Sequence, residues 1–375
     1  MRKKFKKILV TGGAGFIGSH VVDELVKSGY KVRILDSLCY PSHDGKLPFW
    51  INKKAEFIHG DVTKKKDWVR ALDGVEAIIH LAAYMDYHKN FSGYVRTNIE
   101  SIALMFEVIL ENNIKIKKII SASSQSVYGE GKYKCIKHGE FYGVKRSEDQ
   151  LRKHIWEQLC PRCDRVSLPV IEEEEDDNLN PLSPYGISKL SSELMLKNLG
   201  HEYNVPVVLL RFSIVLGARQ SYRHFYSGAL RSFTVNVLSN DPIQLNEDGK
   251  QIRDFVHVRD VALVHIFVLE DNRTNFESYN VGRGKSTSVL ELAKMVAKVG
   301  MVDFNPLLNN RFRVGSTRHS MMSIAKLRKL GWKPKYSIED AVKEYYKWIR
   351  QFKDLDKILT SNELQMKNSG IIKNY

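Results

Sequence analysis

The amino-acid sequence predicts an α/β fold with a doubly wound parallel sheet. Short apolar runs alternate with amphipathic helical patterns from residue 8 to about residue 283, the order expected of parallel strands joined by helices. A glycine-rich turn directly follows the first apolar run. The chain has 375 residues, of which 43% are hydrophobic and 27% charged, as in a globular protein with a sizeable core.

The glycine-rich turn belongs to the most specific local pattern of the chain. An apolar strand, 8–11, is followed by the stretch 12–18 and then by a helical pattern. Gly12 permits the tight turn, Gly15 lets the backbone approach a pyrophosphate, and Gly18 lets the helix pack against the strand. The helix N-terminus then faces the phosphates of a dinucleotide. This predicts a Rossmann-type unit, with cofactor contacts from Gly12, Gly15, Phe16, Ile17 and Gly18.

The second strand of this unit, 32–35, ends at Asp36. A carboxylate at this position can accept hydrogen bonds from a ribose diol and would repel a 2′-phosphate. We therefore expect Asp36 to bind the cofactor and the protein to prefer NAD to NADP.

The alternation of strands and helices continues along the chain, with strands expected at 56–58, 77–81, 118–121 and 207–212 and a helix at 97–110. It predicts an NAD-binding Rossmann domain, a smaller α/β substrate domain, an insertion and a tail that is an extra helix or disordered. Their expected bounds are 1–212 with 252–283, 213–251 with 284–350, 130–175 within the first domain, and 351–375.

Tyr185 and Lys189 lie four residues apart and therefore on one face of a predicted helix. A phenol ordinarily loses its proton near pH 10, and a neighbouring cation favours the phenolate. Tyr185 is thus a candidate base, with Lys189 as the cation that lowers its pKa. The same spacing also occurs by chance on amphipathic helices with an exposed lysine. The dinucleotide-binding unit upstream is what favours the catalytic interpretation.

The insertion contains four residues with metal-ligand spacing, Cys135 and His138 followed by Cys160 and Cys163. The pattern C-x-x-H with C-x-x-C is typical of a structural zinc ribbon, and four ligands complete a tetrahedron without leaving a catalytic position open. The alternative is three free cysteines and a surface histidine. We expect a zinc-ribbon-like insertion with one structural zinc ion.

The chain resembles the extended short-chain dehydrogenases/reductases of the NAD-dependent nucleotide-sugar epimerase/dehydratase family over roughly residues 7–350. Within that family it is most similar to the dTDP-L-rhamnose 4-epimerase group, because of the cysteine-bearing insert and the stretches 217–221 and 225–228. The motifs that carry the family resemblance are the glycine-rich turn, His80-Leu81-Ala82-Ala83, Tyr185 with Lys189, Leu210-Arg211-Phe212, Arg253-Asp254-Phe255-Val256-His257-Val258 and Leu330-Gly331-Trp332.

The resemblance implies a third catalytic residue, Ser124, whose hydroxyl contacts the substrate. Dehydratases of the family place an Asp-Glu pair directly after this hydroxyl, but the present chain has Gln125 and Ser126. Dehydration is therefore disfavoured, and epimerisation at C4 of a nucleotide-diphosphate sugar, through transient oxidation by NAD, is expected. The alternatives are a dehydrogenase or reductase of the same fold and a non-catalytic NAD-binding regulator.

The resemblance also implies further binding residues. For the cofactor they are Asp61, Val62, Leu81, Ala82, Ala83 and Asn98, beside Tyr185 and Lys189. For the substrate they are Ser124, Ser213, Arg219, Arg253 and Arg313, with arginines on the diphosphate and Ser213 where relatives often carry asparagine.

Composition limits the partners of the protein. The net charge of +15 favours anionic ligands, but the lysines are scattered, so we expect a solvated basic surface and no nucleic-acid groove. No apolar run is long enough to span a membrane, and four cysteines do not make a disulfide scaffold. We expect a cytoplasmic homodimer. The helices that begin at Thr97 and Pro184 are expected to pair through extra apolar residues, namely Met105, Leu190, Leu194 and Met195.

Overall fold

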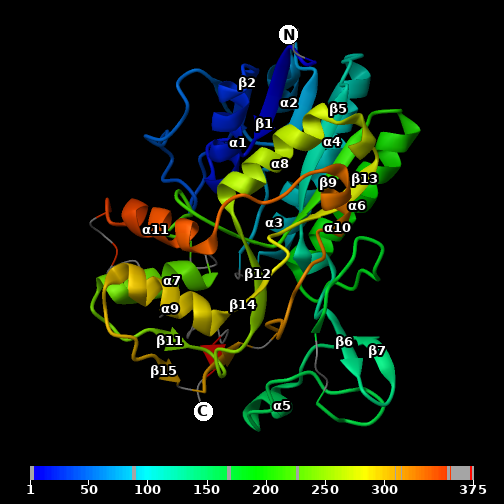
Figure 1. The fold of residues 1–375 in the computed structure, drawn as a ribbon. Coiled ribbons are helices and arrows are strands. Elements are labelled where there is room, and N and C mark those ends of the chain that lie inside the picture. The colour runs from blue at the N-terminus through cyan, green and yellow to red at the C-terminus, as the bar shows by residue number, and fades with distance from the viewer. Residues whose placement is uncertain are drawn as a thin grey trace.

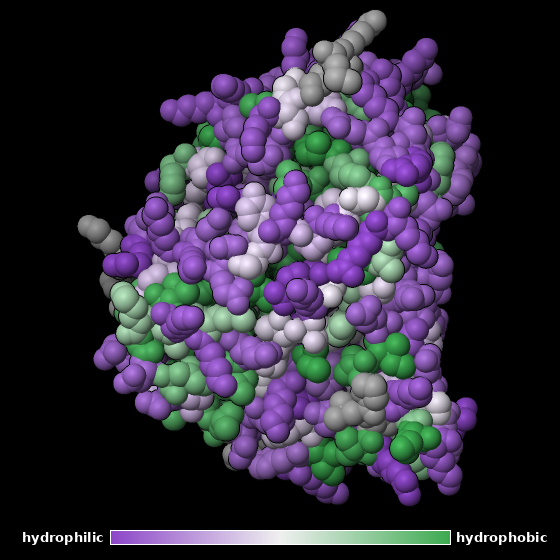
Figure 2. All heavy atoms as spheres, viewed as in Figure 1, coloured by the Kyte–Doolittle hydropathy of each residue, from purple (hydrophilic) through white to green (hydrophobic). Residues whose placement is uncertain are grey.

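The computed structural model describes residues 4–86, 90–166, 170–224, 228–308, 310–313 and 315–352, together with 355, 372 and 373 (Figure 1). The stretch 225–227 and most of the expected tail, 351–375, lie outside these residues. Within the described part of the chain, no helix is both long enough and apolar enough to cross a membrane. Figure 2 shows a mainly hydrophilic face with hydrophobic residues in small, separate groups.

The centre of the molecule is a sheet of seven parallel strands in the order β13-β9-β5-β4-β1-β2-β3. The order runs outward in both directions from the neighbours β1 and β4, which confirms the predicted doubly wound sheet. The strands are β1 (Lys7–Thr11), β2 (Lys31–Asp36), β3 (Glu56–His59), β4 (Ala77–His80), β5 (Lys118–Ser124), β9 (Val207–Phe212) and β13 (Glu277–Val281).

Helices cover both faces of this sheet and bury two separate apolar clusters. One face is covered by α1 (Phe16–Lys27) and α8 (Val258–Glu270), which pack against each other (Figure 1). The other is covered by α2 (Lys65–Leu72), α4 (Ser101–Glu111) and α6 (Pro184–Glu202). Ahead of α4, α3 (Phe91–Tyr94) and a π-helical turn (Val95–Glu100) extend the helix that the sequence predicted from residue 97. Short 3₁₀ turns follow β5 (Gln125–Val127) and α8 (Asn272–Thr274), and α10 (Ala325–Leu330) packs beside β13.

A second lobe lies below the carboxyl edge of the sheet (Figure 1). It contains α7 (Gly228–Leu238), α9 (Val289–Gly300) and α11 (Ile338–Ile349), which share a third apolar cluster. Its short strands are β10 (Ile214–Leu216), β12 (Ile252–His257), β14 (Ser286–Ser288), β11 (Gln244–Leu245), β15 (Leu307–Leu308), β16 (Phe312–Arg313) and β17 (Ile372–Lys373).

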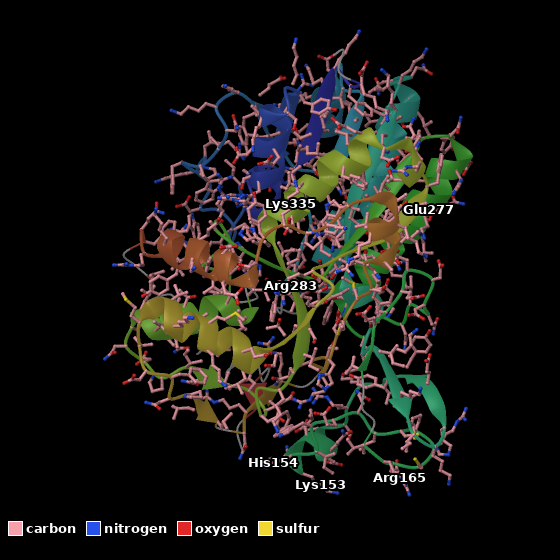
Figure 3. All side chains as sticks on the ribbon, in the orientation of Figure 1. Lys153, His154, Arg165, Glu277, Arg283 and Lys335 are labelled. Carbon is pink, nitrogen blue, oxygen red and sulfur yellow. The ribbon has the colours of Figure 1, made fainter. Side chains whose placement is uncertain are left out.

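The insertion forms a lobe of its own beside the second lobe (Figure 1). It contains a three-stranded sheet, β7-β6-β8, and one short helix. Figure 3 labels Lys153, His154 and Arg165 at its outer end, remote from the central sheet. The elements are β6 (Lys132–Cys135), β7 (Gly139–Tyr142), α5 (Glu148–Arg152) and β8 (Val170–Ile171).

Candidate functional site

The glycine-rich turn has the geometry of a phosphate cradle. Gly12 adopts a left-handed φ of 68°, and a Cβ atom on Gly18 would lie only 2.1 Å from the carbonyl oxygen of Gly12. A Cβ atom on Gly15 would instead meet only that oxygen, at 3.3 Å, and would otherwise enter open space. Gly15 precedes α1 without a side-chain cap, so the first amides of the helix, at Phe16, Ile17 and Gly18, face that space. The turn therefore fits the pyrophosphate of a dinucleotide.

Asp36 is tied to this turn at the end of β2. One carboxylate oxygen accepts a hydrogen bond from the amide of Ala14 at 2.9 Å, and the other accepts one from the amide of Leu38 at 2.9 Å. The indole of Trp50 donates to the carbonyl oxygen of Ala14 at 3.1 Å. Asp36 and Trp50 thus hold the turn from two sides. The sequence did not indicate Trp50, because it belongs to a long loop without a motif.

Thr11 connects β1 to the residues that follow β4. Its hydroxyl contacts Nδ1 of His80 at 2.8 Å and accepts from the amides of Leu81 and Ala82, each at 3.2 Å. A Cβ atom on Gly12 would lie 2.8 Å from the nitrogen of Ala82. Leu81, Ala82 and the neighbouring Ala83 are therefore placed beside the glycine-rich turn. Thr11 was missed at the sequence level, since a strand-end threonine has no distinguishing pattern.

Three other residues expected at the cofactor have contacts within the chain. Asp61 forms a turn by accepting from the amide and hydroxyl of Thr63, and Val62 is buried in the core. Asn98, in the π-helical turn, accepts from the amide of Tyr84 and donates to its carbonyl oxygen and to the hydroxyl of Ser188. Asn98 therefore clamps α6 to the loop after β4.

Tyr185 and Ser124 meet at the carboxyl end of β5. Ser124 is its last residue, and Tyr185 is the second residue of α6, whose N-cap is Ser183. A hydrogen bond joins the hydroxyls of Ser124 and Tyr185. A Cβ atom on Gly186 would lie 2.6 Å from the carbonyl oxygen of Ser126, so the glycine next to Tyr185 permits this close approach. Gly186 has no sequence pattern that distinguishes it from other helix-start glycines.

Lys189 lies one turn further along α6 and is buried. Its ammonium donates to the carbonyl oxygen of Ala122 in β5 at 2.7 Å, and burial lowers its pKa to about 8. Burial raises the pKa of Tyr185 to about 12, and the hydrogen bond from Ser124 opposes that rise. The expectation that Lys189 lowers the pKa of Tyr185 stays a prediction: within the chain itself burial raises that pKa, and the ammonium of Lys189 donates to the carbonyl oxygen of Ala122.

Besides Ser124, the four other residues expected at the substrate are held in different ways. Arg253 donates to the carbonyl oxygens of Ile252, Thr317 and Arg318. Arg219 forms an ion pair with Asp23 of α1 at 2.8 Å. Arg313 lies in β16, and the buried hydroxyl of Ser213 has no hydrogen-bond partner among the described residues. The structure thus places Arg253 and Ser213 below the carboxyl edge of the sheet but directs Arg219 towards α1.

Cys135, His138, Cys160 and Cys163 come together in the insertion, with their ligand atoms all within 4.8 Å of one another. Two sulfur atoms, of Cys135 and Cys163, are 3.8 Å apart, and Nδ1 of His138 lies 3.8 Å from Cys135 and 3.3 Å from Cys160. A tetrahedral zinc ion bound to sulfur at about 2.3 Å separates its ligand atoms by about 3.8 Å. The arrangement therefore fits a tetrahedral ion.

Comparison with known proteins gives consistent matches. Residues 8–282 match the model of the NAD dependent epimerase/dehydratase family. A dTDP-L-rhamnose 4-epimerase of Burkholderia thailandensis is 31% identical over 359 residues, which cover 92% of this chain and 95% of that protein. A putative UDP-glucose 4-epimerase of Methanocaldococcus jannaschii is 32% identical over 347 residues, covering 92% and 98%.

Solved structures agree with these matches. A UDP-glucose 4-epimerase of Thermotoga maritima with UDP-glucose superposes with a TM-score of 0.75 at 29% identity, covering 92% of this chain and 99% of that one. A UDP-glucuronic acid 4-epimerase of Bacillus cereus in complex with NAD has a TM-score of 0.72 at 28% identity, with the same coverage.

Proposed function

We propose that this chain, which belongs to the NAD-dependent epimerase/dehydratase family, inverts C4 of a nucleotide-diphosphate sugar with NAD as its cofactor. The observation that carries the proposal is the convergence of Ser124, Tyr185 and Lys189 beside a dinucleotide cradle. The names of the relatives, which are 4-epimerases for dTDP- and UDP-sugars, support the reaction class.

In this proposal Tyr185, as phenolate, takes the proton from the C4 hydroxyl of the sugar and later returns it. NAD, bound at the glycine-rich turn, would accept hydride from C4 and give it back to the opposite face. Ser124 donates a hydrogen bond to the same C4 oxygen and stabilises its developing charge. Lys189 orients the nicotinamide ribose. Arg253, Arg313 and Ser213 hold the diphosphate while the 4-keto sugar turns in the pocket.

The residues after Ser124 favour epimerisation over dehydration. Gln125 accepts a hydrogen bond from Ser320 at 3.1 Å, and the hydroxyl of Ser126 lies 3.1 Å from that of Ser124. Neither can act as the acid and base needed to eliminate water. A dehydrogenase or reductase of the same fold is the second candidate, because it would use the same Ser124, Tyr185 and Lys189.

The test is conversion of dTDP- and UDP-sugars followed by NMR at C4. Tyr185→Phe should abolish turnover and leave NAD bound, because it removes only the base. In deuterated water the product should carry no deuterium at C4. Activity retained in Tyr185→Phe would refute the assignment, and steady release of NADH would indicate the dehydrogenase.

The domain organisation follows from this assignment. We propose that residues 1–212 with 252–283 bind NAD and that residues 213–251 with 284–350 bind the substrate. The separate apolar cluster of α7, α9 and α11 supports a distinct substrate lobe. Arg219 would contribute to the substrate only after leaving Asp23.

We further propose that Cys135, His138, Cys160 and Cys163 bind one structural zinc ion. Their separations match a tetrahedron, and four protein ligands leave no open position for catalysis. Elemental analysis of chelator-free protein should find one zinc per chain. If Cys160→Ser changes neither the zinc content nor the stability, the four residues do not form this site.

We propose a homodimer paired through α4 and α6. Of the four apolar residues expected there, Leu194 is 61% exposed, whereas Met105 is buried in the core and Leu190 and Met195 pack against apolar clusters. Met105 was thus wrongly expected at the interface. Ile187, which lies in α6 like Leu194 and is 53% exposed, is an additional candidate. Light scattering should give a dimer that Leu194→Glu dissociates; a monomeric wild type at micromolar concentration would contradict this.

A further inference from the structure

A buried network of ion pairs joins the insertion to two segments of the second lobe. Arg146, in the insertion and nearly inaccessible to solvent, forms a two-pronged pair with Glu247, with both N–O distances 3.0 Å. It also donates to the carbonyl oxygens of Trp156 and of Ser316, each at 2.8 Å. Arg146 therefore contacts both the turn before β12 and the segment that follows Arg313.

Arg318 forms the second branch of this network. Its Nε and Nη2 donate to Oε1 of Glu157 in the insertion, at 3.0 and 2.5 Å. Its Nη1 donates to Glu247 at 2.9 Å and to Asp248 at 2.8 Å. Although burial alone would raise it, hydrogen bonds from His319 and Arg318 lower the pKa of Glu157 to about 2, so this carboxylate is ionised at neutral pH.

The network ends on the arginine proposed for the substrate diphosphate. Arg253 donates to the carbonyl oxygens of Thr317 and Arg318 at 2.6 and 2.8 Å, so these two residues fix its guanidinium. Nδ1 of His319 accepts from the amide of Ile252, and its Nε2 contacts Glu157 at 2.7 Å. The side chain of Arg253 is thus positioned by the segment 317–319, and that segment is held by Glu157.

The backbone of Glu247 is held in an unfavourable conformation by the network. Its φ of 53° lies in the left-handed region, which a residue with a Cβ atom enters only at an energetic cost. The two guanidinium groups of Arg146 and Arg318 compensate for that cost. Buried ion pairs contribute little net stability. The loss of one partner, however, leaves an uncompensated buried charge, so arrangements that break the pair are strongly disfavoured.

The four residues of the proposed metal site are close in sequence to the residues of this network. Glu157 precedes Cys160 by three residues, and the amide of Cys160 is bonded to the carbonyl oxygen of Arg165. Tyr133 precedes Cys135 by two residues in β6, and its ring lies 6.2 Å from that of His319. Closing the cluster therefore fixes both parts of the insertion that touch the segment 317–319.

We propose that Glu157 and Arg146 are positioning residues. Through Arg318 and Glu247 they let the insertion set the position of Arg253 and of the segment 316–319, and so the affinity for the nucleoside diphosphate part of the substrate. This inference rests on the proposed function. It separates two tasks, since the insertion acts on binding, and Ser124, Tyr185 and Lys189 act on the chemical step.

The test compares Glu157→Gln with Glu148→Gln in the full-length protein. Glu148 lies in the same insertion but pairs with the exposed Arg152, so it is a matched control. Loss of a partly buried charge-assisted contact should weaken dTDP or UDP binding, measured by calorimetry, by about tenfold and raise KM similarly. The kcat value and the NAD content should stay within about twofold of wild type. Glu157→Asp, which keeps the carboxylate, should restore part of the affinity.

Metal removal provides the second arm. Chelation should weaken diphosphate binding in the wild type. In Glu157→Gln it should weaken binding little further, because both changes act through the same contact between Glu157 and Arg318. If Glu157→Gln does not fold, Arg146→Lys serves instead, since it keeps the charge but loses the two-pronged contact with Glu247. Unchanged affinity, a loss of kcat instead of affinity, or an equal effect of Glu148→Gln would overturn the proposal.

Hydrogen exchange distinguishes failure of this proposal from failure of the proposed function. Exchange in 246–254 and 315–320 should accelerate in Glu157→Gln and on chelation, whether or not any sugar is epimerised. Unchanged exchange in these segments refutes the positioning role even if epimerase activity is found. Accelerated exchange without any epimerase activity refutes only the assigned reaction.

Discussion

The proton affinity of Tyr185 is set by two opposed effects at its hydroxyl. Burial raises its pKa to about 12, and the hydrogen bond from Ser124 opposes that rise. With a raised pKa, only a small fraction of Tyr185 is the phenolate at neutral pH. The rate should therefore increase with pH as the phenolate fraction grows. Ser124 therefore affects the chemistry twice, by favouring the phenolate and by stabilising the C4 oxygen.

Ser124→Ala should lower kcat by about a hundredfold and move the rising limb of the pH–rate profile to higher pH. The removed donor stabilised the phenolate, so its loss raises the pKa of Tyr185 further. Ser123→Ala is the control, since the buried hydroxyl of Ser123 has no hydrogen-bond partner among the described residues. A profile that moves to lower pH in Ser124→Ala would show that the bond does not favour the phenolate.

Asp36 should give the protein its preference for NAD. Its carboxylate is fixed by the amides of Ala14 and Leu38 and lies at the end of β2, where a 2′-phosphate would meet its negative charge. Calorimetry should show tighter binding of NAD than of NADP, and Asp36→Ser should reduce the difference. Equal affinity of the wild type for the two dinucleotides would contradict this reading.

At the scale of elements, the packing of α6 against the 3₁₀ turn after β5 determines where Tyr185 lies. Gly186→Ala would put a Cβ atom 2.6 Å from the backbone oxygen of Ser126, so α6 would have to shift. The expected result is a large loss of kcat, with a destabilisation of about 1–3 kcal/mol. The measurement is kcat beside denaturant unfolding.

Gly200→Ala on the same helix is the matched control for this element. Its Cβ atom would also meet a neighbour at 2.6 Å, but that neighbour is the side chain of Val207, remote from Tyr185. It should be destabilised without a comparable loss of kcat. If both variants lose stability and activity in proportion, the glycine has no special role in placing Tyr185.

The elements that could be predicted from the sequence are those with a local signal. The turn from Gly12 to Gly18 and the pair Tyr185 and Lys189 have fixed spacings, and each lies where it was expected. Trp50, Gly186 and the partners of Arg146 have no such signal, because their roles depend on contacts between residues far apart in sequence. The rise in the pKa of Tyr185 could not be predicted for a related reason: the sequence shows a neighbouring charge but not the extent of burial.

At the scale of the whole molecule, the second lobe and the insertion meet at charged groups that are largely held away from water. The central sheet, the substrate lobe and the insertion each have their own strands and helices, and Arg318, Arg146 and Glu247 are buried where the second lobe meets the insertion. Buried ionisable groups make the stability of such a molecule depend on pH. The histidines provide the most accessible case, because they titrate under mild conditions.

The fold should lose stability as the pH falls from about 6.5 to about 4. Burial lowers the pKa of His80 to about 3 and those of His257 and His265 to about 4. In the unfolded chain these side chains take up a proton near pH 6.5. Between the two values the unfolded state binds more protons, so the free energy of unfolding falls as the pH falls, by at most about 1.4 kcal/mol for each pH unit and each histidine.

His265→Phe isolates one of these contributions, since the ring of His265 is fully buried beside Phe212 and a phenyl group can take its place. Unfolding by denaturant at pH 7.5 and pH 5.0 should show that the wild type loses about 2 kcal/mol more than the variant over this range. Equal losses in the two proteins would mean that His265 is protonated within the fold at pH 5.0 and that its burial does not keep it neutral.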